Sequence, residues 1–406
     1  MLRIKAFQGL SPTPPLAAEV ACVPYDVVDR DEAAALANGH PYSLLHVDRA
    51  EIDLPRETGP YSDAVYAKAR ENFQLLEKMG ALIRESEPCI YLYQQRMGQH
   101  VQVGVATVCH IEDYENDIIK KHEKTRRDKE DDRTRLIGTL SADTGPVFLT
   151  YRDSASLDGL VANVRKGAPV YDFTAPDGIQ HTVWRVAGAQ AFVEAFGRVP
   201  VAYVADGHHR TASAVRVGRE RREANPAHTG HEEYNWFLAV LFPASQLQIL
   251  PYNRAVKDLN GHSKEAFLEA VGRAFTLKPN GPPTPAHPGE IRMYLDGAWY
   301  DLAWKPAPDA DPISQLDVTG LQDRLLAPLL GIDDPRTSKR IEFIGGIRGT
   351  DELVKLVDSG KAAVAFSMYP TTVDQLMAIA DAGQIMPPKS TWFEPKLRSG
   401  FFIHTF

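Results

Sequence analysis

The stretch Val204-Ala-Asp-Gly-His-His-Arg-Thr-Ala-Ser-Ala214 indicates the fold of this chain most directly. Before it, residues 199–204 are short and apolar, which predicts a buried strand. After it, Ala212, Ala214 and Val215 suit a helix packed on that strand. The sequence therefore predicts a strand that passes through a glycine into a helix start, and proteins commonly bind phosphate at such a turn.

The turn itself carries residues that suit an anion. The first turn of the expected helix offers unpaired N–H groups, Gly207 permits close backbone approach, and Arg210 can contact an anion through two N–H groups. Asp206 can hold Mg²⁺ or cap the helix. A short motif is weak evidence, and a capped helix with His208 and His209 on the surface explains the same residues.

The composition is that of an ordinary globular protein. The chain has 406 residues, of which 44% are hydrophobic and 24% charged, and this length suits roughly two or three domains. No run of about 18 apolar residues occurs and the N-terminus lacks a secretory signal, so we expect a cytoplasmic protein without a membrane span. The net charge of −8 argues against sequence-independent binding to nucleic acid. Cys22, Cys89 and Cys109 are widely spaced and are expected to be buried, reduced thiols.

The hydrophobic periodicity predicts an α+β protein. Residues 62–82 have the spacing of an amphipathic helix, as do residues 372–382. Residues 89–94 and 101–108 predict two strands joined by a glycine turn, and residues 146–151 predict another strand.

Turn residues and Pro-rich pieces divide the second half of the chain. Asp296-Gly297 favours a type I′ turn inside a hairpin at residues 291–304, and the Pro-rich pieces at 278–289 and 305–312 are typical of linkers. The expected organisation is a core with an N-terminal α/β extension at 1–250, a small α/β insert with the hairpin at 251–312, and a C-terminal α/β segment that completes the site at 313–406.

A strongly charged segment could carry chemistry. Ile119-Lys-Lys-His-Glu-Lys-Thr125 is followed by residues 126–135, where most side chains are charged. Runs of mixed sign are usually solvated helix faces. Alternatively, Glu123 is a general base, because one carboxylate within hydrogen-bond reach of an alcohol can take its proton, and a nearby lysine meets a phosphate.

Two later segments carry polar groups at expected loops. Pro251-Tyr-Asn-Arg254 follows an apolar run, and it is either a strand end with an Asn turn or a loop that contacts substrate. In Met386-Pro-Pro-Lys-Ser-Thr-Trp-Phe-Glu-Pro-Lys396 two prolines stiffen a loop that presents the ammonium and hydroxyl donors of Lys389, Ser390 and Thr391. Such a loop suits a small anionic group, although a plain surface turn explains it too.

Taken in order, these segments resemble the bacterial domain-of-unknown-function family 1015. The likeness rests on Val23-Pro-Tyr-Asp-Val-Val28, Lys-His-Glu-Lys-Thr with downstream Lys129 and Asp132-Arg133, Asp-Gly-His-His-Arg, Pro-Tyr-Asn-Arg and Met-Pro-Pro-Lys-Ser-Thr. It covers nearly the whole chain. More distantly, the chain resembles the ParB/sulfiredoxin-like superfamily, whose members place a helix start against nucleotide phosphate. This resemblance implies an α+β nucleotide-binding core with insertions.

Within that superfamily the chain is most similar to the archaeal free serine kinases, which phosphorylate L-serine with a nucleotide and Mg²⁺. Their Pro-His-Glu segment, whose glutamate is the catalytic base, corresponds to His122-Glu123, with Lys121 in place of the proline. Their Asp-Gly-His-His-Arg turn is unchanged here, and their Pro-Lys-Thr-Thr segment corresponds to Pro388-Lys-Ser-Thr391. The longer stretch between Glu123 and Asp206 is an insertion that we expect to be a lid, an altered pocket or a dimerisation element.

The resemblance implies a phosphotransferase that uses ATP or ADP and Mg²⁺ on a small hydroxyl substrate, with free L-serine as the first candidate and O-phosphoserine as product. The implied catalytic residues are Glu123, Asp206, His208 and His209, with Asp206 as the metal ligand. The implied nucleotide-binding residues are Gly207, His208, His209, Arg210 and Thr211. The implied substrate-binding residues are Tyr252, Asn253, Arg254, Lys389, Ser390 and Thr391. A homodimer stays open.

Two other functions fit parts of the sequence. One is a nucleotide-binding regulator that changes conformation without turning over a small molecule; its DNA-clamping form is disfavoured by the acidic balance and by the lack of an evident helix-turn-helix pattern. The other is metal-assisted hydrolysis at Asp206, His208 and His209. This ranks lowest, because adjacent histidines point in different directions on a helix, whereas paired ligands usually sit four residues apart.

Overall fold

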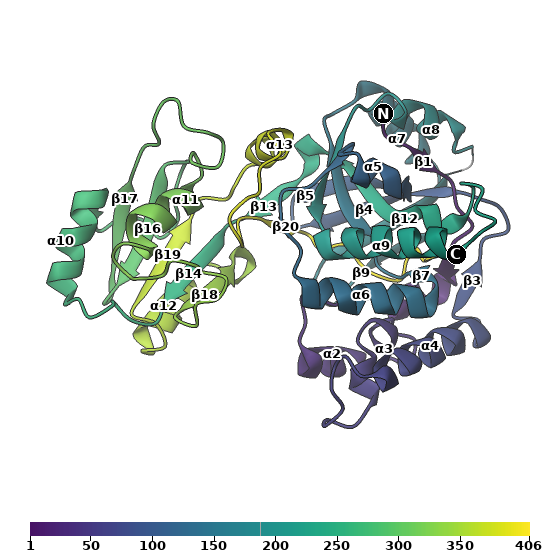
Figure 1. Cartoon of the computed structure of the whole chain (residues 1–406), viewed down its shortest axis with the longest axis horizontal. Helices are drawn as coiled ribbons and strands as arrows, with labels where there is room; N and C mark the ends of the chain where they lie inside the picture. The colour runs from purple at the N-terminus through teal and green to yellow at the C-terminus, as the bar shows by residue number, and fades with distance from the viewer. Residues whose placement is uncertain (187) are drawn as a thin grey trace. The chain divides into compact units, whose positions relative to one another are not determined.

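The computed structural model describes residues 1–186 and 188–406. The chain divides into two units, of which unit 1 comprises Met1–Leu247 and Pro395–Phe406 and unit 2 comprises Gln248–Glu394 (Figure 1). Both units combine helices with sheets, which confirms the expected α+β class. Across the described residues, no helix has the length and apolar character needed to span a membrane.

The division into units differs in part from the expected organisation. The expected boundary after residue 250 lies close to the end of the first segment of unit 1, but the expected boundary at residues 312/313 falls inside unit 2. The reason is strand pairing, because Tyr252–Val256 pairs with Ile341–Gly345 and Val364–Met368 in one sheet. Pairing over such a separation is invisible to local periodicity.

Unit 1 is built on a nine-stranded mixed sheet. Its strands run in the order β6 (Ile119–Lys120), β11 (Ala202–Asp206), β8 (Val147–Tyr151), β12 (Trp236–Pro243), β5 (His100–His110), β4 (Ile90–Met97), β10 (Gln180–Val186) and β9 (Tyr171–Thr174), while β1 (Ile4–Lys5) pairs with β5. The pairs β6/β11 and β8/β12 are parallel and the others antiparallel. The sheet therefore joins strands that are far apart in sequence.

Helices surround this sheet and pack on one another. They are α1 (Ala17–Val20), α2 (Arg30–Ala37), α3 (Leu45–Asp48), α4 (Asp63–Lys78), α5 (Ile111–Glu115), α6 (Arg127–Leu140), α7 (Ala155–Val164), α8 (Gln190–Phe196) and α9 (His208–Ala224). Helix α6 packs between α9 and α4, as Figure 1 shows. The Ser213 hydroxyl of α9 donates to the Glu130 carbonyl of α6 at 3.0 Å. This contact fixes α9 against the charged segment that the sequence places after Glu123.

The core of unit 1 lies on the central strands. Leu149, Val204 and Leu241 come from three neighbouring strands and are 0% exposed. Burying one such side chain contributes about 1.5–3 kcal/mol. The core thus holds β8, β11 and β12 in place, and with them the turn that follows β11.

The segment between Glu123 and Asp206 is an integral part of this sheet. It contributes β8, β9 and β10 together with α6, α7 and α8. β10 pairs with β4 over seven residues, and β8 lies between β11 and β12. The longer stretch therefore builds part of the sheet of unit 1 and is not a separate lid, while an altered pocket and a dimerisation element stay open as predictions.

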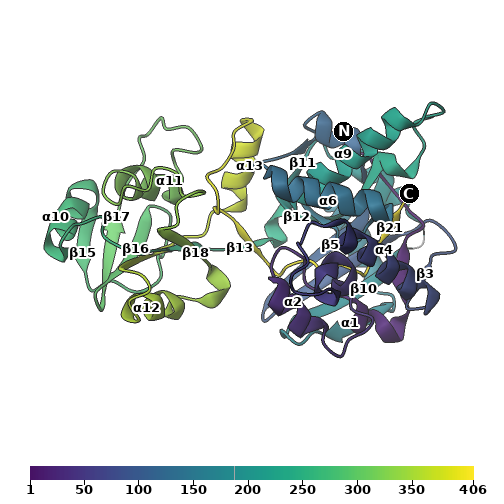
Figure 2. The ribbon, with the colours of Figure 1, turned by 60° about the horizontal axis from the view of Figure 1, so that its bottom comes forward.

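The last residues of the chain return to unit 1. β21 (His404–Thr405), which is labelled in Figure 2, pairs with β7 (Ala142–Asp143). The short strands β2 (Leu10–Pro12) and β3 (Leu82–Arg84) pair with each other. His404 is buried between the carboxylates of Asp143 at 3.5 Å and Glu233 at 3.0 Å. Burial acts to lower the pKa of His404, but these two carboxylates outweigh it and raise that pKa.

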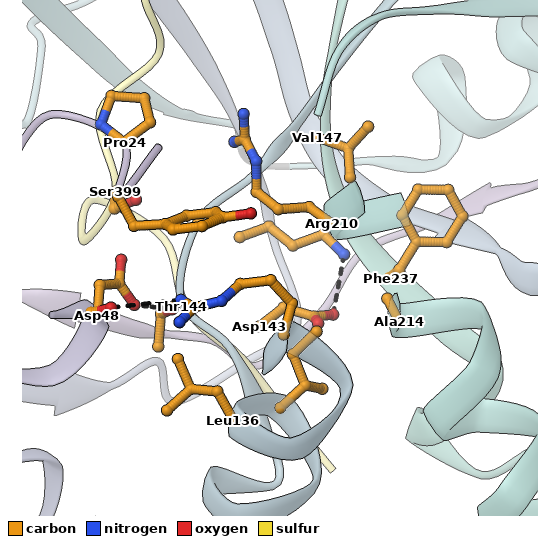
Figure 3. A pocket seen from close by; sticks show the side chains of 15 residues that line it. Pro24, Asp48, Leu136, Asp143, Thr144, Val147, Arg210, Ala214, Phe237 and Ser399 are labelled. Carbon is orange, nitrogen blue, oxygen red and sulfur yellow. Dashed lines mark hydrogen bonds between the residues drawn. The ribbon is translucent and has the colours of Figure 1, made fainter. Parts of the chain in front are cut away.

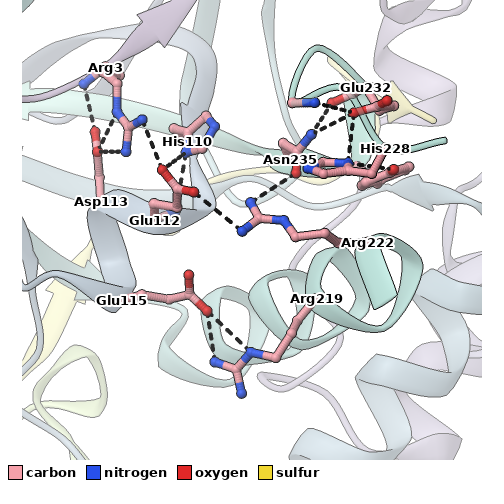
Figure 4. Close-up of polar contacts among 12 residues, drawn as sticks. Arg3, His110, Glu112, Asp113, Glu115, Arg219, Arg222, His228, Glu232 and Asn235 are labelled. Carbon is pink, nitrogen blue, oxygen red and sulfur yellow. Dashed lines mark hydrogen bonds and ion pairs between the residues drawn. The ribbon is translucent and has the colours of Figure 1, made fainter. Parts of the chain in front are cut away.

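A second polar network holds the N-terminus and α9 (Figure 4). Arg3 donates to Asp113 at 2.8 Å and to Glu112 at 3.1 Å, while Arg222 of α9 donates to Glu112 at 3.3 Å. Most of these side chains are partly exposed, and such pairs are worth about 0–1 kcal/mol each. The network fixes the orientation of α9 more than it adds stability.

Unit 2 contains a six-stranded antiparallel sheet. The strand order is β15 (Thr276–Pro279), β17 (Ala298–Ala303), β16 (Glu290–Leu295), β19 (Val364–Met368), β14 (Tyr252–Val256) and β18 (Ile341–Gly345). Its helices are α10 (Lys264–Ala274), α11 (Asp317–Leu321), α12 (Asp351–Asp358) and α13 (Val373–Asp381), and β13 (Gln248–Leu250) pairs with β20 (Trp392–Glu394). Helix α12 packs on β14, β16 and β19.

Several local predictions are confirmed. β4 and β5 form the expected pair, α4 and α13 are helices, and β8 is a strand. Asp296 and Gly297 have φ of 46° and 78°, the positive values that a type I′ turn requires between β16 and β17. The three cysteines are buried and free of disulfides.

Candidate functional site

Parallel pairing of β6 and β11 brings two chemically rich segments to one edge of the sheet. Ala202 pairs with Ile119 and Tyr203 with Lys120, so both strands end at the same edge. His122 and Glu123 follow β6, and Gly207 follows β11. Ligands of open α/β sheets commonly bind beyond the carboxyl ends of the strands. The β11 register also shifts between Val204 and Asp206, and such irregularities often lie next to functional sites.

The turn after β11 needs its glycine. Gly207 has φ of 95° and is the N-cap of α9, a conformation that residues with a Cβ adopt only at a cost. A Cβ at Gly207 would lie 3.1 Å from Nε of Arg210. No side chain of the described residues caps α9, and its first turn carries no acidic residue. The positive end of the helix dipole is therefore open to an anion.

Asp206 sits between two cations. Its Oδ2 atom lies 3.5 Å from Nη2 of Arg210 and 3.5 Å from Nζ of Lys396, and its side chain is 28% exposed. Burial acts to raise the pKa of Asp206, but the charges of Lys396 and Arg210 lower it to about 2. Asp206 is therefore ionised at neutral pH, and the turn presents a carboxylate flanked by a guanidinium and an ammonium group.

Arg210 is buried, and its hydrogen bonds are only partly satisfied. Nη1 donates to the carbonyl of Pro146, whereas Nε has no partner in the part of the chain that the structure describes. The predicted bidentate contact with an anion would need Nε together with Nη2, which already faces Asp206. Thr211, also predicted to bind nucleotide, is fully buried and donates to the Gly207 carbonyl at 3.0 Å. Its hydroxyl therefore supports the helix start.

A small cavity lies against Arg210 (Figure 3). Its volume is about 30 Å³, and Asp48, Arg133, Thr144 and Ser399 are among the residues that line it. Thr144 donates to Asp48 at 2.6 Å, and burial raises the pKa of that carboxyl. The volume suits one or two water molecules and is far too small for a nucleotide. The cavity belongs to the packing that positions Arg210.

Two histidines from the two segments meet at the sheet edge. The ring centroids of His122 and His208 lie 4.5 Å apart, and the two rings are perpendicular to one another. Burial lowers the pKa of His122 to about 4. Burial and the neighbouring His122 lower the pKa of His208 as well. Both rings are therefore neutral at neutral pH, and positive charge at the turn comes from Arg210 and Lys396.

His209 points to a different neighbour. Its Nε2 accepts a hydrogen bond from the backbone N–H of Arg126 at 3.0 Å, and burial lowers its pKa too. The adjacent His208 and His209 therefore have different neighbours, since His208 faces His122 and His209 bonds to Arg126. His209 joins the start of α9 to the loop that leads into α6, which places the charged segment beside the turn.

Glu123 is exposed and close to the histidine pair. One carboxylate oxygen of Glu123 and one ring nitrogen each of His122 and His208 all lie within 4.8 Å of one another. The structure thus brings together Glu123, Asp206, His208, His209 and Arg210 at one edge of unit 1. The sequence motifs predict catalytic and nucleotide-binding roles for these residues, and those roles stay predictions.

The predicted substrate-binding residues lie in unit 2. Arg254 is 3% exposed and donates to the carbonyls of Tyr252 and Lys389, the latter at 3.1 Å. Burial lowers the pKa of Arg254 to about 10. The Lys389 ammonium lies 5.4 Å from the centre of the Tyr252 ring, and Lys389 has a positive φ of 57°.

The other three members of this set differ in their availability. Asn253 is 1% exposed and accepts from the N–H of Met368 at 3.0 Å. Ser390 is buried and donates to the Pro387 carbonyl at 2.6 Å, so both side chains support the local fold. Thr391 is half-buried. Arg254 also lines a cavity of about 280 Å³ in unit 2, with Pro387 and Pro388 on its wall.

Two residues of the site were not predicted from sequence. The sequence pattern marks His122 only as the neighbour of Glu123, and Lys396 only as the end of a Pro-rich loop. The sequence signal for His122 is its position just after the short strand β6, in a chain that has a second His motif at His208-His209. Lys396 offers no such signal, because its partner Asp206 is 190 positions away in the chain.

The fold and the site define an α+β protein with a charged, buried site at a strand-to-helix turn. The chain belongs to the family described as Protein of unknown function (DUF1015), which matches residues 4–319. This confirms the family recognised from the motifs, and the match ends before the Met-Pro-Pro-Lys-Ser-Thr segment. A comparison with curated proteins gave no match.

Three solved structures illustrate what the chain is similar to. A mutant free serine kinase in complex with AMP is 12% identical at a TM-score of 0.37, over 73% of this chain and 92% of that chain. SbnI with a C-terminal truncation, from Staphylococcus aureus, is 12% identical at 0.37, over 72% and 85%. A conserved hypothetical protein from Pyrococcus furiosus is 12% identical at 0.36, over 73% and 94%. At these TM-scores the likeness assigns no function to this chain.

Proposed function

We propose that unit 1 is a nucleotide- and Mg²⁺-dependent phosphotransferase acting on a small hydroxyl compound, with free L-serine as the best candidate and O-phosphoserine as the product. The observation that carries the proposal is the position of Glu123, whose carboxylate lies within 4.8 Å of the first side chain of the uncapped helix α9. A base and an anion site are thereby adjacent. The proposal also takes unit 1 as a ParB/sulfiredoxin-like core.

The nucleotide phosphates are assigned to the start of α9. The open N-terminal turn at Gly207, the Arg210 guanidinium and the Lys396 ammonium provide N–H donors and positive charge within one turn of helix. Phosphoryl transfer depends mainly on positioning and charge stabilisation, so such donors supply most of the catalysis. The neutral His208 and His209 can donate hydrogen bonds but add no charge.

Glu123 is assigned as the general base. Its carboxylate accepts the proton of the acceptor hydroxyl, whose oxygen attacks the terminal phosphorus as the bond to the nucleotide oxygen breaks. The exposure of Glu123 leaves it accessible to a substrate hydroxyl. General bases contribute about 10²- to 10⁴-fold to a rate.

Asp206 is the residue assigned to Mg²⁺. Its carboxylate is ionised at neutral pH, and Mg²⁺ is usually held by one or two carboxylates together with substrate phosphates, so the donor set fits. When bound, the ion would neutralise charge on the phosphates. Arg210 and Lys396 hold the Asp206 carboxylate in place from either side.

The acceptor specificity is assigned to unit 2 residues, with either ATP or ADP as donor. Arg254 is the strongest member of that set, because it is buried beside a cavity of about 280 Å³ and its guanidinium donates to backbone carbonyls, with no ion pair to a carboxylate among the described residues. A buried guanidinium without a carboxylate partner favours an anionic group such as the α-carboxylate of an amino acid. The loop with Lys389, Ser390 and Thr391 is assigned to the same substrate.

The alternative function is a nucleotide-binding regulator without turnover. It shares the phosphate site at α9 and differs only in needing no base. Glu123→Gln separates the two, because it removes the base while leaving the helix start intact. The proposed enzyme loses about 10²- to 10⁴-fold in turnover and keeps its ADP affinity in calorimetry. The matched control is Glu77→Gln, an exposed carboxylate on α4. Equal turnover in the two variants would remove Glu123 from the base role.

A further inference from the structure

The edge of the sheet in unit 1 holds three side chains of the kind that bind metal ions. One ligand atom each of His122, Glu123 and His208 lies within 4.8 Å of the other two. The two histidines are 2% and 5% exposed, and Glu123 is exposed. The site therefore has two buried ligands and one at the solvent boundary, through which an ion can enter.

Three of the four ring nitrogens of the two imidazoles lack a hydrogen-bond partner among the described residues. Nδ1 and Nε2 of His122 and Nε2 of His208 are buried without a partner among the described residues. The Val204 carbonyl favours a proton on His122, but it does not reach hydrogen-bond geometry. Leaving a buried polar group unsatisfied costs about 1–3 kcal/mol. Unpartnered ring nitrogens on two facing histidines therefore indicate a missing ligand.

We propose that His122, Glu123 and His208 bind one divalent ion of the zinc, cobalt or manganese type, with the remaining coordination positions open to water. Imidazole nitrogen suits zinc and similar transition metals, a carboxylate also suits manganese, and Mg²⁺ prefers a shell of oxygen atoms. Ligands about 2.1 Å from one ion lie roughly 3–4 Å apart, so atoms within 4.8 Å need only small side-chain rotations.

The surroundings set the balance of charge at this site. The carboxylate of Asp206 favours positive charge on both histidines, while Arg210 disfavours it on His208. Arg210 and Lys396 both face Asp206, whose carboxylate offsets one of their two positive charges. The lone pairs of the two rings and the carboxylate of Glu123 thus supply the attraction for the ion.

This ion is distinct from the Mg²⁺ of the proposed phosphotransferase, and its binding requires neither nucleotide nor substrate. The ligand set also differs from Asp206, His208 and His209, because His209 already accepts a hydrogen bond from Arg126. The two histidines come from different segments, since His122 lies in the loop after β6 and His208 is the first residue of α9. A carboxylate bound to such an ion is a weaker base, so occupancy would oppose the proposed role of Glu123.

The test is a titration of the full chain with Co²⁺ in the absence of nucleotide, followed by visible absorption of the bound ion. We expect one Co²⁺ per chain, displaced by Zn²⁺ and not by excess Mg²⁺. His122→Gln and Glu123→Gln should each weaken binding by at least about 10- to 100-fold, the range that even outer-shell substitutions cost. The matched control is His209→Gln, which removes the adjacent histidine and should leave Co²⁺ affinity unchanged.

The two variants protect the test against misfolding, since Glu123 is exposed and its replacement does not disturb the core. A wild-type chain with no Co²⁺ absorption would overturn the proposal, and so would equal affinities in Glu123→Gln and His209→Gln. Because the titration contains no nucleotide, its failure leaves the phosphotransferase untouched. Conversely, an inactive enzyme that still binds Co²⁺ through these residues would leave the metal site intact.

Discussion

Substitution of Gly207 by alanine probes the link between the turn and its chemistry. Gly207 has φ of 95°, beyond the left-handed region that other residues occupy at about 50–70°. Its new Cβ would also lie 3.1 Å from the Arg210 guanidinium. The matched control is Gly98→Ala in the β4–β5 turn, where φ is 58° and an added Cβ would meet no atom within 4 Å.

The two variants should differ in size of effect. Left-handed backbone costs a residue with a Cβ about 1–2 kcal/mol, and less favoured regions cost up to about 3 kcal/mol. We therefore expect Gly98→Ala to lose about 1 kcal/mol and Gly207→Ala about 2–3 kcal/mol. For a unit of this size that corresponds to a fall in melting temperature of roughly 2–4 °C and 4–12 °C respectively.

The same substitution should weaken nucleotide binding. Displacing Arg210 removes a charge-assisted contact worth about 1.5–3 kcal/mol, which is about 10- to 100-fold in affinity. Calorimetric unfolding and titration with ADP measure both effects on the same samples. Equal melting temperatures for the two variants, or ADP affinity unchanged in Gly207→Ala, would refute the reasoning.

Three further results are expected. Lys396→Met removes the charge that contributes most to lowering the pKa of Asp206 from 3.8 to about 2. The ionised carboxylate contributes stability above pH 3.8, and this stability is lost as the pH falls through 2. In urea unfolding, the variant should therefore lose on the order of 1 kcal/mol at neutral pH, and its stability should depend less on acid. The raised pKa of His404 means that its contribution is complete below its ordinary value of 6.5 and is lost as pH rises through the folded value; His404→Gln should flatten that alkaline loss, and an unchanged pH profile would contradict it. Zn²⁺ should inhibit phosphoryl transfer at constant Mg²⁺, and His122→Gln should relieve this inhibition. Equally strong inhibition of the His122→Gln variant would show that Zn²⁺ does not act through the proposed metal site.

Local sequence patterns predict the strands that pair with their neighbours in the sequence. The turn at Gly98 joins two adjacent strands, and Asp296-Gly297 fixes its hairpin through positive φ angles. The strand and helix around Gly207 were predicted for the same reason, because apolar periodicity and a glycine break lie within a few residues. The strand itself begins at Ala202, later than its apolar run indicates.

Contacts between distant residues were beyond the same signals. The pairing of β14 with β18 and β19 joins distant segments into the sheet of unit 2, but the sequence of Tyr252–Val256 does not indicate which strands pair with it. The expectation of a solvated helix face at residues 126–135 is also only partly right, because Asp132 and Arg133 are buried and ion-paired at 2.8 Å. Charge pattern alone cannot show which side of α6 meets another element.

The candidate site was predicted in its parts and not in its assembly. Glu123 and the Asp-Gly-His-His-Arg turn were recognised as motifs, and the parallel register of β6 and β11 is what places them together. The contacts of His122 with His208 and of Lys396 with Asp206 form only once the folded chain brings these distant segments together. Side-chain pairs of this kind follow from strand order, which the sequence does not reveal locally.

Phosphorus NMR of the purified chain with Mg²⁺, L-serine and either ATP or ADP tests the central claim most directly. We expect a new phosphomonoester signal that requires serine and is lost in Glu123→Gln but retained in Glu77→Gln. The donor that gives the signal identifies the nucleotide. Measurable nucleotide binding without any such product from either donor would contradict the phosphotransfer to serine and favour the regulatory function or another acceptor.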